Sequence, residues 1–320
     1  MPGVPSVRIR VPASTANLGP GFDAVGLALG LWDEYDVTVG DGGEGLRIAV
    51  SGEGASEVPL DATHLVARAM AHGFARLGAP MPPAVCLVAR NGVPHGRGLG
   101  SSAAAIVAGV VAAQVFSRTG DWQDSPAGAP VDVDLDTATD LATELEGHPD
   151  NASASVRGGL TVSWTRDPGD PVGSATGTAS VPIHPDITAV VLMPQAQLAT
   201  HTARAVLPPT VEHTAAALNS GRAALLVEAL SRRPDLLLAA TRDWLHQGFR
   251  RAAFAPSMDL VDALRAQGHA AVISGAGPSV VVLTTRAVAG SVATSAPELP
   301  AGWQRLEPGV PASGVQVNRR

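Results

Sequence analysis

Three glycines and two serines stand together in residues 94–104, PHGRGLGSSAA, directly before an apolar run that continues to Ala113. This run predicts a buried helix that begins near Ser101. A helix start leaves backbone N–H groups unpaired and attracts anions, and glycines upstream let a polyphosphate approach without meeting a Cβ. Serine hydroxyls in the first turn are suitable ligands for Mg²⁺. The stretch therefore indicates either a phosphate-binding loop or a tight strand-to-helix turn with a serine cap.

The amino-acid composition excludes several kinds of chemistry. The chain has 320 residues and a net charge of −7, and all 22 of its basic residues are arginine. Without lysine it can have neither a Walker-type phosphate loop nor a Schiff-base or general-base lysine. The arginines are scattered rather than gathered into a basic stripe with aromatic residues, so we expect no nucleic-acid partner.

No segment of the sequence predicts a membrane span or a secretion signal. The longest apolar stretch, residues 103–113, is far shorter than the roughly 20 residues that cross a bilayer, and the N-terminus lacks an apolar signal segment. The single Cys86 cannot form an internal disulfide, which fits a reducing compartment. We expect a soluble, cytoplasmic protein, and leave open whether it forms a homodimer.

The periodicity of apolar residues predicts the elements that carry the glycine stretch. Strands are expected at residues 7–11, 35–39, 46–50, 84–89, 158–165, 187–193, 270–274 and 280–284. Helices are expected at residues 63–77, after the glycine stretch, at 133–147 with a stop at Gly147, and several times between 200 and 268. Strands and helices follow each other without a regular alternation, so the fold class is α+β.

Residues 167–180 are rich in glycine, proline and serine and contain little that could be buried. Such a composition is typical of a long surface loop or of a link between domains. We therefore place the domain boundary at its start, with one domain over residues 1–166 and a second over residues 167–320.

Three motifs together resemble those of the GHMP kinases. The stretch PHGRGLGSSAA is similar to the phosphate loop of this family, VPASTANLGPGFDAVGLAL (residues 11–29) to the homoserine kinase version of its N-terminal motif, and ISGAGPSVVVL (residues 273–283) to its C-terminal glycine loop. Three motifs in the right order are far more specific than one, so the resemblance favours the phosphate loop over the tight turn. It implies an ATP-binding N-terminal domain like ribosomal protein S5 and a ferredoxin-like C-terminal domain.

The resemblance also implies a set of site residues. The ATP-binding loop would comprise Pro94, His95, Gly96, Arg97, Gly98, Leu99, Gly100, Ser101, Ser102, Ala103 and Ala104. The pocket for L-homoserine would comprise Asn17, Asp23, His148, Asn151, Thr200, Arg204, Arg250 and Gly275, with the two arginines binding the α-carboxylate. An arginine fork is the group that binds a carboxylate best.

Each of these residues also has a structural interpretation. Asp23 could fix its own loop through an Asx turn, and Arg204 and Arg250 could form surface ion pairs. For His148 we expect orientation of its loop through backbone contacts. The neighbour Arg251 is an alternative to Arg250, because residues 248–249 depart from the family pattern.

For the catalytic centre the resemblance implies Ser102, Glu144 and Asn151, with Ser102 and Glu144 as ligands of Mg²⁺. Glu146 is the alternative, two residues along the same expected helix and therefore on another side of it. We find no convincing general base, so the expected reaction is direct attack of the homoserine hydroxyl on ATP. The alternatives are another kinase of the superfamily, acting on shikimate or in the mevalonate pathway, and a sensor without turnover. A dehydrogenase that binds NAD at the glycine loop is a further alternative.

Overall fold

A computed structural model describes residues 4–40, 45–118, 121–167, 175–198, 200–295 and 299–320. The strands are β1 (Ser6–Asn17), β2 (Gly21–Val39), β3 (Gly45–Gly52), β4 (Ala84–Asn91), β5 (Leu160–Thr165), β6 (Thr176–Val181), β7 (Ile187–Met193), β8 (Ala270–Ile273), β9 (Val280–Thr285), β10 (Gln304–Leu306) and β11 (Gln316–Arg319). The helices are α1 (Leu65–Arg76), α2 (Ser101–Ser117), α3 (Leu135–Glu146), α4 (Asp150–Arg157), α5 (Thr200–Ala205), α6 (His213–Ser231), α7 (Leu237–Ala240), α8 (Gln247–Arg250), α9 (Ala255–Ala266) and α10 (Arg286–Ser295).

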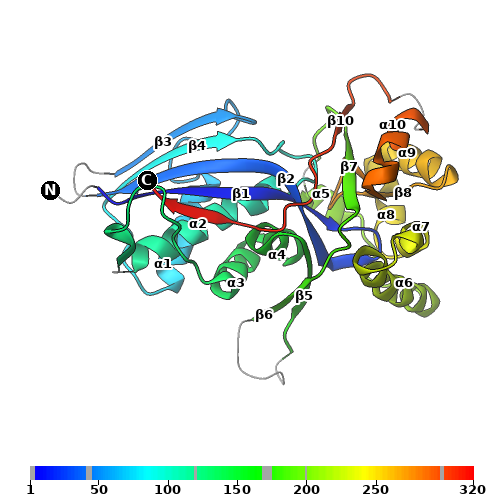
Figure 1. Cartoon of the computed structure of the whole chain (residues 1–320), viewed down its shortest axis with the longest axis horizontal. Coiled ribbons are helices and arrows are strands. Elements are labelled where there is room, and N and C mark those ends of the chain that lie inside the picture. Colours follow the sequence, from blue (N-terminus) through cyan, green and yellow to red (C-terminus); the bar gives the residue numbers. More distant parts are fainter. Residues whose placement is uncertain (1–3, 41–44, 119–120, 168–174, 199, 296–298) are drawn as a thin grey trace.

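A seven-stranded sheet forms the first half of the molecule, in the order β11-β1-β2-β4-β3 with the β5–β6 hairpin attached to β2. All of its pairings are antiparallel except that of β3 with β4. In β1 the side chains alternate: Val7, Ile9 and Val11 are fully buried, whereas Arg8 and Arg10 lie on the other face. Figure 1 shows the long β1–β2 hairpin, in blue, running from this sheet into the second half of the molecule.

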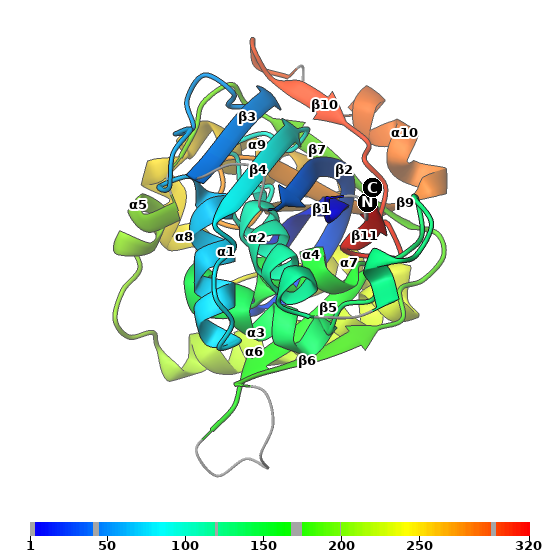
Figure 2. The ribbon, with the colours of Figure 1, turned by 90° about the vertical axis from the view of Figure 1, so that its left-hand side faces the viewer.

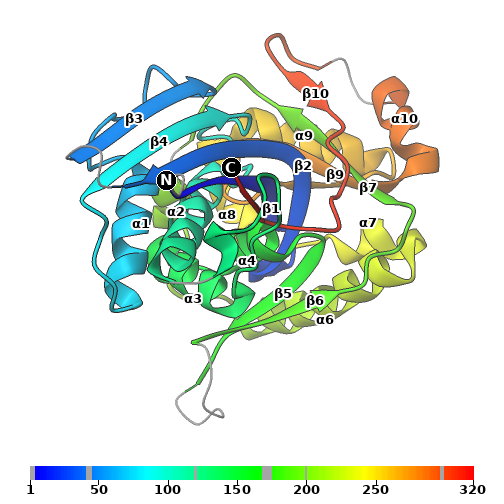
Figure 3. The same ribbon diagram turned by 60° about the vertical axis from the view of Figure 1, so that its left-hand side comes forward.

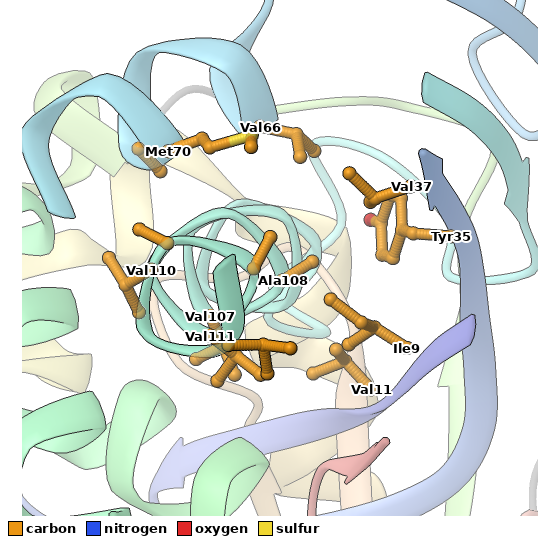
Figure 4. Packing of buried hydrophobic residues seen from close by; sticks show 14 of the residues in the cluster. Ile9, Val11, Tyr35, Val37, Val66, Met70, Val107, Ala108, Val110 and Val111 are labelled. Atoms are coloured by element: carbon orange, nitrogen blue, oxygen red, sulfur yellow. The ribbon is translucent and has the colours of Figure 1, made fainter. Parts of the chain in front are cut away.

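Helix α2 is the centre of the helical layer that covers this sheet. It is apolar on all sides, and twelve of its seventeen residues are buried, which explains how a helix can be held rigidly without an exposed face. Val107, Ala108 and Val111 of this helix lie between the side chains of α1 and those of β1 and β2 (Figure 4). Figure 2 shows α1 and α2 side by side beneath the sheet.

The second half contains a four-stranded antiparallel sheet in the order β10-β7-β9-β8. One face of it packs on α9 and α10. The other face packs on α6 and α7 and on the far ends of β1 and β2. The N-terminal hairpin therefore supplies core residues to both halves. Its turn, residues 17–23, lies against the second half, where the carbonyl of Pro20 accepts a hydrogen bond from Asn219 and that of Gly19 lies 2.8 Å from Nε2 of His246.

The two sheets divide the chain differently from the expected boundary. That boundary falls between β5 and β6, two strands that pair over their whole length, and both belong to the first sheet, as the hairpin in Figure 3 shows. Strand β11 also returns to the first sheet, beside β1. A loop rich in glycine, proline and serine therefore does not mark a domain boundary here, because the strands on both sides of it are hydrogen-bonded to each other in one sheet. Residues 168–174 of the expected linker lie outside the described residues.

The α+β class and the expected strands and helices of the first half are confirmed. The helix expected at residues 63–77 is α1 (Leu65–Arg76), and α3 ends where Gly147 adopts the left-handed conformation, with φ of 83°. Across the described ranges, no helix combines the length and the hydrophobicity that a membrane crossing needs.

Candidate active site

The glycine loop before α2 adopts a backbone that only glycine accommodates without strain. Gly96, Gly98 and Gly100 have φ values of 65°, 72° and 73°, in the left-handed region. A Cβ on Gly98 would lie 2.3 Å from the carbonyl oxygen of Ser274, and one on Gly100 would lie 2.2 Å from Oγ of Ser14. Gly100 is the N-cap of α2 and no side chain caps the helix, so the first N–H groups are left for a ligand.

The three sequence motifs meet at this loop. Oγ of Ser274 donates to the carbonyl of Gly98 at 2.6 Å and lies 2.8 Å from Oγ1 of Thr15. Nδ2 of Asn17 donates to the carbonyl of Gly275 at 3.0 Å. Segments that are far apart in the sequence therefore hold one another, and each contributes backbone to the same wall of the site.

A cavity of about 220 Å³ opens in front of the N-terminus of α2. Eleven of the expected site residues line it: Asn17, Gly96, Gly98, Gly100, Ser101, Ser102, His148, Asn151, Arg204, Arg250 and Gly275. Four further residues complete the lining: Glu146, Asp150, Leu198 and Ala276. The cavity is therefore built from both halves of the molecule.

Glu144, the expected ligand of Mg²⁺, does not line this cavity. Its carboxylate receives hydrogen bonds from Arg76, at 2.8 and 2.9 Å, and lies 3.0 Å from Nε2 of His72, on the exposed side of α3. Glu146, which lines the cavity, accepts a hydrogen bond of 2.7 Å from Oγ of Ser102. Two residues span about 200° around a helix, so the two carboxylates point apart. The local pattern did not distinguish them, because Glu144 follows the buried Leu141 by three residues and Glu146 follows the buried Ala142 by four.

Arg250 is a buried cation with no carboxylate partner among the described residues. The residue is 1% exposed; its Nε donates to the carbonyl of Ala203 at 2.9 Å and its Nη1 to Nδ1 of His246 at 3.2 Å. Burial, followed by the charge of Arg204, lowers the pKa of Arg250 to about 10, so it remains protonated at neutral pH. Arg251 instead pairs with acidic residues of α9 on the surface.

Asp23 and Arg204 bind each other beside the cavity. Both nitrogens at the end of the Arg204 side chain donate to the Asp23 carboxylate, and each side chain is 35% exposed. Burial lowers the pKa of Arg204, but the hydrogen bond and charge of Asp23 outweigh this and raise it. Asp23 itself, whose φ is 54°, is next to the cavity without lining it. The side chain of Thr200 lies outside the described residues.

His148 and Asn151 are fixed by neighbours on the cavity wall. Nδ1 of His148 lies 2.7 Å from Oδ1 of Asp150. Burial lowers the pKa of His148, but the hydrogen bond and charge of Asp150 and the charge of Glu146 outweigh it and raise the pKa. Oδ1 of Asn151 accepts from Oγ of Ser14 at 3.0 Å, which leaves the amide N–H groups of Asn151 available to a ligand.

Several residues of the expected ATP loop do not line this cavity: Pro94, His95, Arg97, Leu99, Ala103 and Ala104. Arg97 points away from it, toward β7, with Nη2 donating to the carbonyl of Gln195 at 2.9 Å. The side chain of Leu99 is buried in the core between the two sheets, and Ala103 and Ala104 are buried in α2. Side chains alternate around the loop, so only part of a continuous motif can face one ligand.

A second cavity of about 350 Å³ adjoins the first and shares Ser101 and Ser102 with it. His95 belongs to this one, together with residues that the sequence did not single out, among them Tyr35, His64 and Asn91. Oδ1 of Asn91 is buried and accepts no hydrogen bond from the described residues. An unpaired buried acceptor in a cavity wall is a mark of a ligand that donates to it.

Comparison with known proteins identifies the relatives of this chain. Residues 64–159 match the family described as "GHMP kinases N terminal domain" and residues 215–300 match "GHMP kinases C terminal". The chain is 47% identical to the homoserine kinase of Streptomyces avermitilis, over 98% of this chain and 95% of that protein. It is 49% identical to the homoserine kinase of Streptomyces coelicolor, over 87% of this chain and 84% of that protein. Its fold is like that of the homoserine kinase crystal structure from Cytophaga hutchinsonii, with a TM-score of 0.80, 23% identity and coverage of 98% and 97%.

Proposed function

The chain belongs to the homoserine kinases of the GHMP kinase superfamily, and on that premise we propose that it transfers the γ-phosphoryl group of ATP to the side-chain hydroxyl of L-homoserine. The product is O-phospho-L-homoserine, an intermediate on the way to threonine. The observation that carries this proposal is Arg250, a buried cation that lacks a carboxylate partner among the described residues and lines the same cavity as the glycine loop. Such a site favours an anion that enters with the substrate.

The amino-acid end of the substrate accounts for the charges on one side of the cavity. We assign the α-carboxylate to Arg250 and Arg204, whose mutual repulsion an anion between them would relieve. The α-ammonium would then compete with Arg204 for Asp23. A zwitterion thus replaces one internal ion pair by two new ones.

The hydroxyl end of homoserine would lie on the opposite side of the cavity, near Asn151 and His148. The amide N–H groups of Asn151, whose oxygen is held by Ser14, can bind the hydroxyl or a phosphate oxygen but cannot accept a proton. His148 is held against Asp150 with a raised pKa, which suits it to carry positive charge beside phosphate rather than to act as a base. We therefore propose in-line attack by the hydroxyl itself, with its proton passing to a phosphate oxygen.

Ser102 and Glu146 would hold Mg²⁺. Their oxygens lie 2.7 Å apart at the start of α2, and a hydroxyl with a carboxylate is a donor set that this hard cation prefers. When bound there, Mg²⁺ supplies charge neutralisation for the triphosphate. The glycine-loop N–H groups hold the phosphate oxygens on the other side.

We place the nucleoside in the second cavity, since it adjoins the phosphate loop through Ser101 and Ser102. Its unpaired acceptor, Oδ1 of Asn91, suits the exocyclic amine of adenine. Guanine carries a carbonyl at the corresponding position, so this acceptor favours ATP over GTP.

The test is ATP-dependent phosphorylation of L-homoserine against serine, threonine, shikimate and mevalonate, with ADP release and phosphorus NMR as readouts. We expect homoserine to have the highest kcat/KM and the phosphate to appear on its side-chain oxygen. A higher kcat/KM for shikimate or mevalonate would replace the proposed substrate. Nucleotide binding without turnover of any of these acceptors would favour a sensor.

A further inference from the structure

His246 stands immediately before α8 and connects two segments of the substrate site. The residue is fully buried. Its Nε2 lies 2.8 Å from the carbonyl oxygen of Gly19, in the turn of the β1–β2 hairpin, and its Nδ1 lies 3.2 Å from Nη1 of Arg250. Both ring nitrogens are therefore engaged.

The two partners determine where the proton of His246 resides. The Arg250 guanidinium can only donate hydrogen bonds, so Nδ1 must be the unprotonated acceptor. The Gly19 carbonyl can only accept, so Nε2 must carry the hydrogen. Both contacts are satisfied by the neutral Nε2–H tautomer alone; the imidazolium would turn an N–H toward the guanidinium.

The ring also supports the aromatic side chain that faces both arginines. Phe22 stacks on His246, with ring centroids 5.2 Å apart and an angle of 23° between the planes. The guanidinium carbons of Arg250 and Arg204 lie 5.5 and 5.6 Å from the centroid of the Phe22 ring. The position of His246 is thus coupled to both of the proposed carboxylate ligands.

We propose that neutral His246 is a positioning residue for the substrate carboxylate: it orients the guanidinium of Arg250 through Nδ1 and holds the 17–23 turn through Nε2. This inference rests on the proposed function, because it takes Arg250 to be a carboxylate ligand. The hydrogen-bond and stacking partners of the His246 ring among the described residues are Gly19, Arg250 and Phe22 and include neither the glycine loop nor the Ser102–Glu146 pair, so we expect the effect to fall on homoserine rather than on ATP.

The charged groups around the ring make this positioning dependent on pH. Asp243 lies 3.6 Å from Nε2 and, like Asp23, favours the imidazolium, whereas burial, the largest influence, and Arg250 oppose it; the net effect lowers the pKa of His246. A His with a lowered pKa stays neutral in the folded protein somewhat below pH ~6.5 and becomes charged only as the pH falls through the folded value. We therefore expect homoserine affinity to be constant near neutrality and to fall in that acidic range.

The experiment compares wild-type protein with His246→Asn and His246→Gln. The oxygen of Asn takes the place of Nδ1 and can still accept from Arg250, whereas the amide N–H of Gln takes the place of Nε2 and can only reach Gly19. Because a hydrogen bond to a charged group contributes about 1.5–3 kcal/mol, we expect His246→Gln to raise the KM for homoserine at least about tenfold. His246→Asn should stay within about threefold of wild type. The KM for ATP should be unchanged in both, and both should lose the acidic fall in homoserine affinity.

Two kinetic outcomes overturn the inference while leaving the proposed function intact. One is an equal KM for homoserine in the wild-type protein and both variants, with all three active; the other is a parallel change in the KM for homoserine and for ATP. Nitrogen-15 NMR of the imidazole in wild-type protein tests the same geometry without activity. The Nε2–H tautomer at neutral pH supports the inference, and the Nδ1–H tautomer or an imidazolium overturns it. Wild-type protein that does not phosphorylate homoserine refutes the proposed function instead.

Discussion

Glu146 and Glu144 form a matched pair for testing the proposed metal site, because they have the same side chain on the same helix and different neighbours. Glu146 accepts a hydrogen bond from Ser102 in the cavity, whereas Glu144 is bound by Arg76 and lies 3.0 Å from His72 on the surface. The perturbation is Glu→Gln at each position, which removes one negative charge and preserves the size of the side chain. Only the substitution at Glu146 should affect phosphoryl transfer.

The expected magnitude follows from the charge that is removed. Two unit charges 4 Å apart interact by about 4 kcal/mol at an effective dielectric constant of 20, which corresponds to about 10³-fold in rate. Glu146 is half-buried at the mouth of a cavity, so solvent reduces this value, and we expect Glu146→Gln to lower kcat by about 10²–10³-fold. A higher Mg²⁺ concentration should restore part of the activity. Glu144→Gln removes a surface ion pair and should change the free energy of unfolding by no more than about 1 kcal/mol, without effect on kcat.

The assay measures ADP release with saturating L-homoserine while Mg²⁺ is titrated, alongside thermal unfolding of each variant. A collapse of activity in Glu144→Gln with near wild-type activity in Glu146→Gln would refute the assignment. Equal losses in both, with lowered melting temperatures, would show that the substitutions act through the stability of α3 rather than through a metal.

Other substitutions test the remaining parts of the site. Arg250→Gln should raise the KM for homoserine about 100-fold with an unchanged KM for ATP, whereas Arg251→Gln, at the surface, should leave both KM values at wild type in the same steady-state assay. Gly98→Ala should weaken ATP binding in calorimetry and cost more stability than Gly78→Ala, because both positions have positive φ but only at Gly98 does a Cβ meet a backbone oxygen, at 2.3 Å. The raised pKa of His148 implies stabilisation that is complete below pH ~6.5 and is lost as the pH rises through the folded value; urea unfolding at about pH 6 and 8 should show this slope in wild type and not in His148→Gln, and an equal slope in both would contradict it.

The sequence determined most of the local structure, because the signals concerned act over a few residues. The glycines at 96, 98 and 100 permit the positive φ values that the loop adopts, and the long apolar run after them predicts the buried helix α2. Alternation in β1 and the glycine at 147 likewise set a strand and a helix end. The family and its fold could be predicted from three motifs in the expected order, which together are far more specific than a single glycine loop.

The tertiary structure decided which of two neighbouring residues enters the site. Glu146 rather than Glu144, and Arg250 rather than Arg251, line the cavity, because the packing of α3 and α8 sets their rotation, and a motif of adjacent like residues does not specify it. The direction of Arg97 and the pairing of β11 with β1 depend in the same way on segments distant in the chain. The sequence analysis did not single out His246 as a functional candidate. Its proposed positioning role depends on contacts with Gly19 and Arg250, which only the folded chain brings together.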